Sequence, residues 1–119
     1  MPNPVVWFEV IGNDAAALKT FYGELFDWPL EEVEVPGYFF ARPEGDEGLQ
    51  GGIGADPSGG AGHVTFYVQV EDLQAALDKA ELLGGRTVMP VSEIPNGPTI
   101  ALFADPEGHT IGLVGTPTA

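Results

Sequence analysis

A repeated hexapeptide is the feature that most constrains the fold of this chain. The letters FARPEG at residues 40–45 return as FADPEG at residues 103–108, with five of six positions identical in a chain of 119 residues. Asp-Pro-Glu-Gly is typical of a type I turn, because aspartate favours its first position, proline its second and glycine its fourth. The repeat therefore predicts two equivalent turns, and a chain in which one structural unit occurs twice.

The first half of the chain shows a strand, a helix and three further strands. An apolar strand over residues 4–12 precedes a helix that is capped by Asp14 and ends before Pro29. The segments LEEVEV, GYFFAR and LQGGIG then indicate three short strands. The apolar stripe predicted for the helix consists of Leu18, Phe21, Tyr22, Leu25 and Phe26.

The second half repeats this order. A strand over residues 63–70 precedes a helix that is capped by Asp72 and closed by Gly84 and Gly85. The segments RTVMPV, PTIALFA and TIGLV predict three more strands, so each hexapeptide lies at the end of the third strand of its half. We therefore expect one domain over residues 1–119, made of two β-α-β-β-β units at about 1–56 and 57–119.

The composition excludes several classes of function. Eighteen acidic and four basic residues give a net charge of −14, which is unsuited to nucleic acid and favours a cationic ligand, unless the charge only serves solubility or salt adaptation. The absence of cysteine excludes disulfides, thiolate metal sites and a cysteine nucleophile. The sequence shows neither a signal peptide nor an apolar run of membrane-spanning length, so a cytoplasmic protein without a membrane partner is expected.

Alternation along the two leading strands separates a core face from a polar face. An acid in the middle of an apolar strand is costly unless it is solvated or paired, which singles out Glu9. Because cations are few, a solvated cavity is favoured over pairing. The predicted core faces carry Phe8 and Val10 in the first strand, and Val64, Phe66, Val68 and Val70 in the second. The opposite faces carry Trp7, Glu9 and Ile11, and His63, Thr65, Tyr67 and Gln69.

The tandem order, the segment FYGELFDW at the end of the first helix and the terminal FADPEGHTIGLV together resemble the vicinal-oxygen-chelate superfamily. This superfamily contains glyoxalase I, extradiol dioxygenases, and fosfomycin- and bleomycin-resistance proteins. The resemblance covers the whole chain. It implies an α+β fold in which two tandem β-α-β-β-β units form a mixed, incompletely closed barrel-like sheet around a ligand cavity.

The resemblance also implies positions for a divalent metal, and the residues there are unsuited to it. The family's ligand positions correspond here to Trp7, Thr65 and Gly112, with Gln50 as the one remaining candidate. We therefore expect no metal and no other cofactor. A shifted site made of His63, Glu9 and Gln50 stays open as an alternative.

The leading hypothesis is a metal-free protein that binds a small organic molecule, with a cationic ligand as one option. Its predicted ligand-binding residues are Trp7, Glu9, Phe40, Thr65, Tyr67 and Met89. The alternative is a lyase or isomerase of the glyoxalase type, with Glu9 or His63 as general base and Tyr67 as hydrogen-bond donor to an oxyanion. A third possibility is a scaffold whose cavity is filled by its own side chains.

The resemblance further implies a homodimer, because single-module relatives commonly form two-fold dimers. The strand edges left exposed by an incompletely closed barrel supply a physical reason for pairing.

Overall fold

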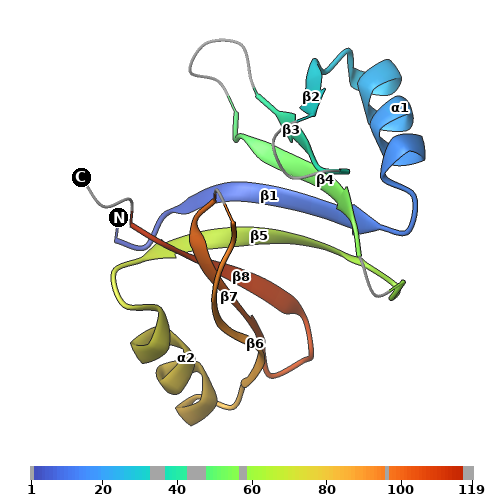
Figure 1. The fold of residues 1–119 in the computed structure, drawn as a ribbon. Helices are drawn as coiled ribbons and strands as arrows, with labels where there is room; N and C mark the ends of the chain where they lie inside the picture. The colour runs from blue at the N-terminus through green and yellow to red at the C-terminus, as the bar shows by residue number, and fades with distance from the viewer. Residues whose placement is uncertain (1, 33–36, 43–47, 57–58, 96, 117–119) are drawn as a thin grey trace. The chain divides into compact units, whose positions relative to one another are not determined.

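Two runs of strand, helix and three strands follow each other along the chain (Figure 1). The computed structural model describes residues 2–32, 37–42, 48–56, 59–95 and 97–116. The first run contains β1 (Val5–Gly12), α1 (Ala15–Phe26), β2 (Leu30–Glu32), β3 (Phe39–Ala41) and β4 (Gly51–Ala55). The second contains β5 (His63–Val70), α2 (Leu73–Leu82), β6 (Arg86–Glu93), β7 (Thr99–Ala104) and β8 (Thr110–Gly115). The predicted α+β class and the two tandem β-α-β-β-β units are confirmed.

The two runs share one strand topology. In the first, the strands are ordered β2-β3-β4-β1, with β4 antiparallel to β3 and parallel to β1. In the second, the order is β6-β7-β8-β5, with β8 antiparallel to β7 and parallel to β5. Each strand of one run therefore has an equivalent in the other, which is the relationship that the repeated hexapeptide predicts.

The chain divides into two compact units. The first unit is Trp7–Val64, and the second unit combines Met1–Val6 with Thr65–Ala119. In the second unit, the backbone N–H of Gln69 donates to the carbonyl oxygen of Pro4 over 2.9 Å, which attaches the start of the chain to β5. The expectation that residues 1–119 form a single domain stays a prediction.

Both helices begin at the aspartates that the sequence indicates. The Asp14 side chain accepts a hydrogen bond from the backbone N–H of Ala17, and that of Asp72 accepts one from Ala75, each over 3.0 Å. The helix α1 ends earlier than Pro29 requires, because Asp27 adopts a left-handed conformation at φ 57°. Within the described ranges, no helix is long and apolar enough to cross a membrane.

The core of the second unit lies between α2 and its sheet. Leu77 and Ala101 are almost completely buried there, together with Val70, Leu73 and Leu113. The predicted core face of β5 is only half correct. Val68 and Val70 contact this cluster, whereas Phe66 is 40% exposed and Val64, which belongs to the first unit, is 76% exposed. The hydrophobic cluster against α2 includes residues only from the carboxyl-terminal half of β5. The apolar alternation at the beginning of β5 therefore does not mark a buried face.

The apolar stripe predicted for α1 is largely exposed, which corrects a second expectation. Phe21 is 58% exposed, and Leu25 and Phe26 are more than half exposed as well. Tyr22 instead stacks against Trp28, whose ring lies 5.7 Å from that of Phe8. The first unit is therefore stabilised by aromatic contacts next to the helix and by fully buried Ile53 in β4.

The second hexapeptide forms the predicted turn. Phe103 and Ala104 end β7, and the N–H of Gly108 donates to the carbonyl oxygen of Asp105 over 2.8 Å. His109 is exposed and lies beside Asp105, with 2.9 Å between Nδ1 and Oδ2. The equivalent turn of the first hexapeptide spans residues 42–45, of which 43–45 lie outside the described residues.

Candidate functional site

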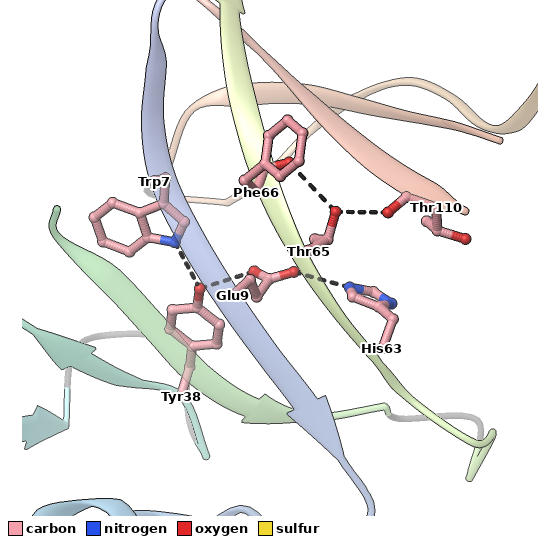
Figure 2. Close-up of polar contacts among 7 residues, drawn as sticks. All are labelled: Trp7, Glu9, Tyr38, His63, Thr65, Phe66 and Thr110. Carbon is pink, nitrogen blue, oxygen red and sulfur yellow. Dashed lines mark hydrogen bonds and ion pairs between the residues drawn. The ribbon is translucent and has the colours of Figure 1, made fainter. Parts of the chain in front are cut away.

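The first unit brings four polar side chains into one hydrogen-bonded chain (Figure 2). The hydroxyl group of Tyr38 donates to Oε2 of Glu9 over 2.8 Å. The indole Nε1–H of Trp7 donates to the same hydroxyl oxygen over 3.2 Å. The other oxygen of Glu9, Oε1, lies 3.2 Å from Nε2 of His63. The indole, the phenol, the carboxylate and the imidazole are thus connected in series.

Glu9 is buried although it is ionisable. Its side chain is 11% exposed, whereas that of His63 is 27% exposed. A buried carboxylate requires hydrogen-bond donors, and Tyr38 and His63 both supply contacts of that kind. Depending on the protonation of the imidazole, the contact with His63 is a hydrogen bond or an ion pair. Glu9 is therefore paired within a polar network, whereas the scarcity of cations in the sequence favours a solvated cavity.

The glycines of β4 create the space that Tyr38 occupies. A Cβ atom at Gly52 would overlap the Tyr38 hydroxyl group, and one at Gly54 would lie 2.7 Å from its ring. On the opposite face of the strand, a Cβ atom at Gly51 would overlap the ring of Phe8. Alternate glycines thus make room for aromatic rings on both faces of β4.

Tyr38 is the residue that sequence reasoning missed. It stands just before β3, in the segment GYFFAR, where nothing in the local pattern marks its hydroxyl group. The signal was indirect: the glycines of GGIG, which offer no functional groups, are what allow a large ring to approach β1.

Phe40 adds a second ring beside this network. Its ring centroid is 5.1 Å from that of Trp7, and the two rings meet edge to face. Tyr38 makes a similar contact with Phe40 at 5.8 Å. The guanidinium carbon of Arg42 lies 5.2 Å from the centroid of Phe40. The predicted site residues Trp7, Glu9, Phe40 and His63 are therefore all in the first unit, with Tyr38 among them.

The remaining predicted site residues lie in the second unit. Thr65 is buried in the second unit, where its hydroxyl group donates to the carbonyl oxygen of Thr110 over 2.6 Å. Tyr67 is buried with its ring against Gly112. Met89 is partly buried in β6 opposite Leu102. Their participation in binding stays a prediction.

The residues at the family's metal positions are committed to other contacts or lack ligand atoms. Trp7 uses its N–H group as a donor to Tyr38, and Thr65 uses its hydroxyl group as a donor to a backbone carbonyl. Gly112 has no side chain, and Gln50 is exposed. Among the described residues, no group of three or more His, Cys, Asp or Glu side chains is placed to hold a metal ion. Trp7 and Gly112 therefore supply no ligand atom for the family's metal, and the absence of a metal stays a prediction.

Comparison with known sequences identifies the family. The family described as Glyoxalase/Bleomycin resistance protein/Dioxygenase superfamily matches residues 5–113. The chain belongs to this superfamily. It is 30% identical over 115 residues to the "Putative glyoxylase CFP32" of Mycobacterium bovis, covering 90% of this chain and 43% of that protein. It is 28% identical over 128 residues to the anthracycline biosynthesis protein DnrV of Streptomyces peucetius, covering 94% of this chain and 46% of that protein. The chain thus spans less than half the length of these two relatives.

A solved structure supports the same fold. The methylmalonyl-CoA epimerase of Mycobacterium tuberculosis superposes with a TM-score of 0.61 at 17% sequence identity, covering 96% of this chain and 88% of the epimerase. At this identity the similarity concerns the fold alone.

Proposed function

We propose that this protein binds a small organic molecule on the face of the first unit that carries Trp7, Glu9, Tyr38 and Phe40, and that it does so without the family's metal. The observation that carries the proposal is the buried Glu9 carboxylate, held at a fixed position by Tyr38 and bordered by aromatic rings. Sites for small organic molecules typically combine an apolar, aromatic lining with a few oriented polar groups.

The geometry of the network supports binding, because it fixes the direction of the polar groups. Tyr38 accepts from Trp7 and donates to Glu9, so its hydroxyl hydrogen points at the carboxylate. Both oxygens of Glu9 have a contact in the network, which fixes the orientation of the carboxylate. The carboxylate is buried, in a location where a charged hydrogen bond is stronger than in water.

Metal-free action is supported by the chemistry of the side chains at the family's ligand positions. An indole, a hydroxyl group that donates to a carbonyl oxygen, and a glycine replace the expected ligands at Trp7, Thr65 and Gly112. Recognition then depends on the ring faces and on Glu9. No step of the proposed function uses a metal.

A second candidate function is favoured by the contact between Glu9 and His63. A carboxylate 3.2 Å from an imidazole nitrogen is an arrangement that can accept a proton and pass it on. The alternative is accordingly a lyase or isomerase in which Glu9 or His63 removes a proton next to a carbonyl group. The predicted role of Tyr67, which lies in the second unit, as hydrogen-bond donor to an oxyanion stays a prediction.

A thermal-shift screen tests the proposed function. The EDTA-treated protein and the Glu9→Gln variant are screened against small anionic, neutral and cationic compounds. A compound that binds only the native state raises the melting temperature by mass action. We expect hits that stabilise the parent by several degrees and lose most of that shift in Glu9→Gln. The matched control is Glu24→Gln, which removes one exposed carboxylate from α1 and should keep the parental shifts.

The outcomes separate the candidates. Equal shifts in the parent and in Glu9→Gln would show that the carboxylate has no part in binding, and would contradict the proposal. For the hits, exchange of carbon-bound hydrogen with D₂O measures proton abstraction. Exchange by the parent that is abolished in Glu9→Gln or in His63→Gln would favour the enzymatic alternative, and its absence favours binding alone.

A further inference from the structure

The register of the first unit's sheet aligns two carboxylates and an aromatic ring in one row. Glu31 in β2 pairs with Phe40 in β3, Phe40 pairs with Gly52 in β4, and Gly52 pairs with Glu9 in β1. Directly paired residues in adjacent strands project to the same face of a sheet. The row is therefore Glu31, Phe40, a position without a side chain, and Glu9.

Gly52 determines which group lies between Phe40 and Glu9 in this row. Its missing side chain is replaced by the hydroxyl group of Tyr38, which donates to Glu9. The Cα atoms of Glu31 and Glu9 are three strand spacings apart, or about 14 Å. Since each glutamate side chain extends several Å along or above the sheet, the two carboxylates can flank a group of about 5–6 Å that rests on the Phe40 ring.

The three aromatic rings and two carboxylates of this face favour a positively charged ligand. Phe40 is in edge-to-face contact with Trp7 and with Tyr38. Aromatic faces attract cations, and quaternary ammonium groups are bound in proteins by such clusters of rings. The guanidinium carbon of Arg42 already lies 5.2 Å from the Phe40 centroid, so this ring holds a cation supplied by the chain itself. The net charge of −14 acts in the same direction over longer range.

The hydrogen bonds of Glu9 indicate which kind of cation fits. Both of its oxygens already have a contact with a donor-bearing group, Tyr38 on one side and His63 on the other. A methylated ammonium supplies positive charge without requiring further acceptors, and its methyl groups contact the rings. We propose that the row of Glu9, Phe40 and Glu31 binds the quaternary ammonium group of an organic cation. This inference rests on the proposed function, because it assigns a ligand class to the same face.

A pair of isosteres tests it. Choline and 3,3-dimethylbutan-1-ol have nearly the same shape, but only choline is charged. We expect calorimetric titration of the parent to show choline binding about tenfold more tightly than the neutral alcohol. Glu9→Gln and Glu31→Gln should each reduce this preference severalfold, whereas Arg42→Gln, which removes the competing cation, should not weaken choline binding.

The neighbouring glutamate provides the matched control. Glu32 pairs with Phe39 and therefore projects from the opposite face of β2, although it has the same charge and is also exposed. Glu32→Gln should bind choline within about twofold of the parent. If it weakens binding as much as Glu31→Gln does, only the overall charge acts and the inference is wrong.

The comparison of isosteres uses the unmodified protein, so it does not depend on the folding of any variant. Equal affinity for the two compounds, or no binding of choline, would overturn the ammonium assignment. Hits of another chemical class that depend on Glu9 would then leave the proposed function standing. No hit of any class in the screen would overturn both.

Discussion

The Tyr38 hydroxyl group donates a 2.8 Å hydrogen bond to the Glu9 carboxylate, although 29 residues separate them in the sequence. The contact passes over β4 at the position where Gly52 has no side chain. The network of the candidate site therefore depends on a residue that itself carries no functional group.

This dependence predicts the effect of one added methyl group. Gly52→Ala would place a Cβ atom on the Tyr38 hydroxyl group, so the ring must move and the hydrogen bond to Glu9 must break. We expect a loss of about 1–3 kcal/mol in the free energy of unfolding, measured by urea denaturation. Gly23→Ala is the control. Its Cβ atom would meet its neighbours at an ordinary 3.6 Å, and alanine within a helix should stabilise by about 0.5–1 kcal/mol. Equal effects of the two variants would contradict this explanation of the glycines.

Removing the hydroxyl group of Tyr38 alone tests its hydrogen bonds with Glu9 and Trp7. Tyr38→Phe keeps the ring but takes away the donor to Glu9 and the acceptor for Trp7. Leaving buried polar groups with fewer partners costs about 1–3 kcal/mol, and we expect a loss of stability in that range. A change within about 0.5 kcal/mol would show that the network contributes little to the fold.

The turn after β7 predicts a pH dependence of stability. The backbone N–H of His109, then its imidazole, and the N–H of Glu107 hydrogen-bond to Asp105, and they lower the pKa of its carboxyl group below the ordinary 3.8. A carboxyl group with a lowered pKa stabilises the folded state fully above its unfolded pKa, and this contribution disappears as the pH falls through the folded pKa. The difference in unfolding midpoint between the parent and Asp105→Asn should thus be largest near neutral pH and shrink below about pH 4. A difference independent of pH would contradict this.

Metal independence can also be measured. We expect the purified protein to carry no stoichiometric transition metal by elemental analysis, and its melting temperature to be unchanged by EDTA. The reason is the unsuitable chemistry of the residues at the family's ligand positions, above all Trp7 and Gly112. A tightly bound ion that is lost on Glu9→Gln or His63→Gln would instead support the shifted metal site.

We predict the oligomeric state from the resemblance to the superfamily and from the exposed edges of the strands. The strands β2 and β6 each end the strand order of their run. Edges of this kind are available for pairing. We expect light scattering at micromolar concentration to give the mass of a homodimer. A monomer mass would show that the edges are protected in another way.

Most of the fold could be predicted from the sequence, because local rules determine it. The caps at Asp14 and Asp72 and the turn at Asp105 depend on interactions within a few residues. The expectations that failed concern burial. Phe21 and Val64 occur at regular apolar spacings, yet both are exposed, because spacing identifies a face without identifying what covers it.

The site could be predicted only in part for a related reason. An acid among apolar residues and the alternation of a strand are visible locally, and they single out Glu9 and Trp7 as candidates. Tyr38 was missed because its role depends on Gly52, a residue without a functional group that becomes a neighbour of Glu9 and Phe40 only through strand pairing.

The two tryptophans permit the most direct test of the binding face. Trp7 belongs to the candidate site, whereas Trp28 packs against Phe8 and Phe26, outside the network of Glu9. An ¹⁵N-labelled, EDTA-treated sample is titrated with the tightest hit of the screen, and the two indole N–H resonances are assigned with Trp28→Phe. We predict that the Trp7 indole resonance shifts with saturation at the measured affinity while that of Trp28 stays in place. A saturable shift of Trp28 alone, or of neither resonance, would contradict binding at Trp7, Glu9, Tyr38 and Phe40.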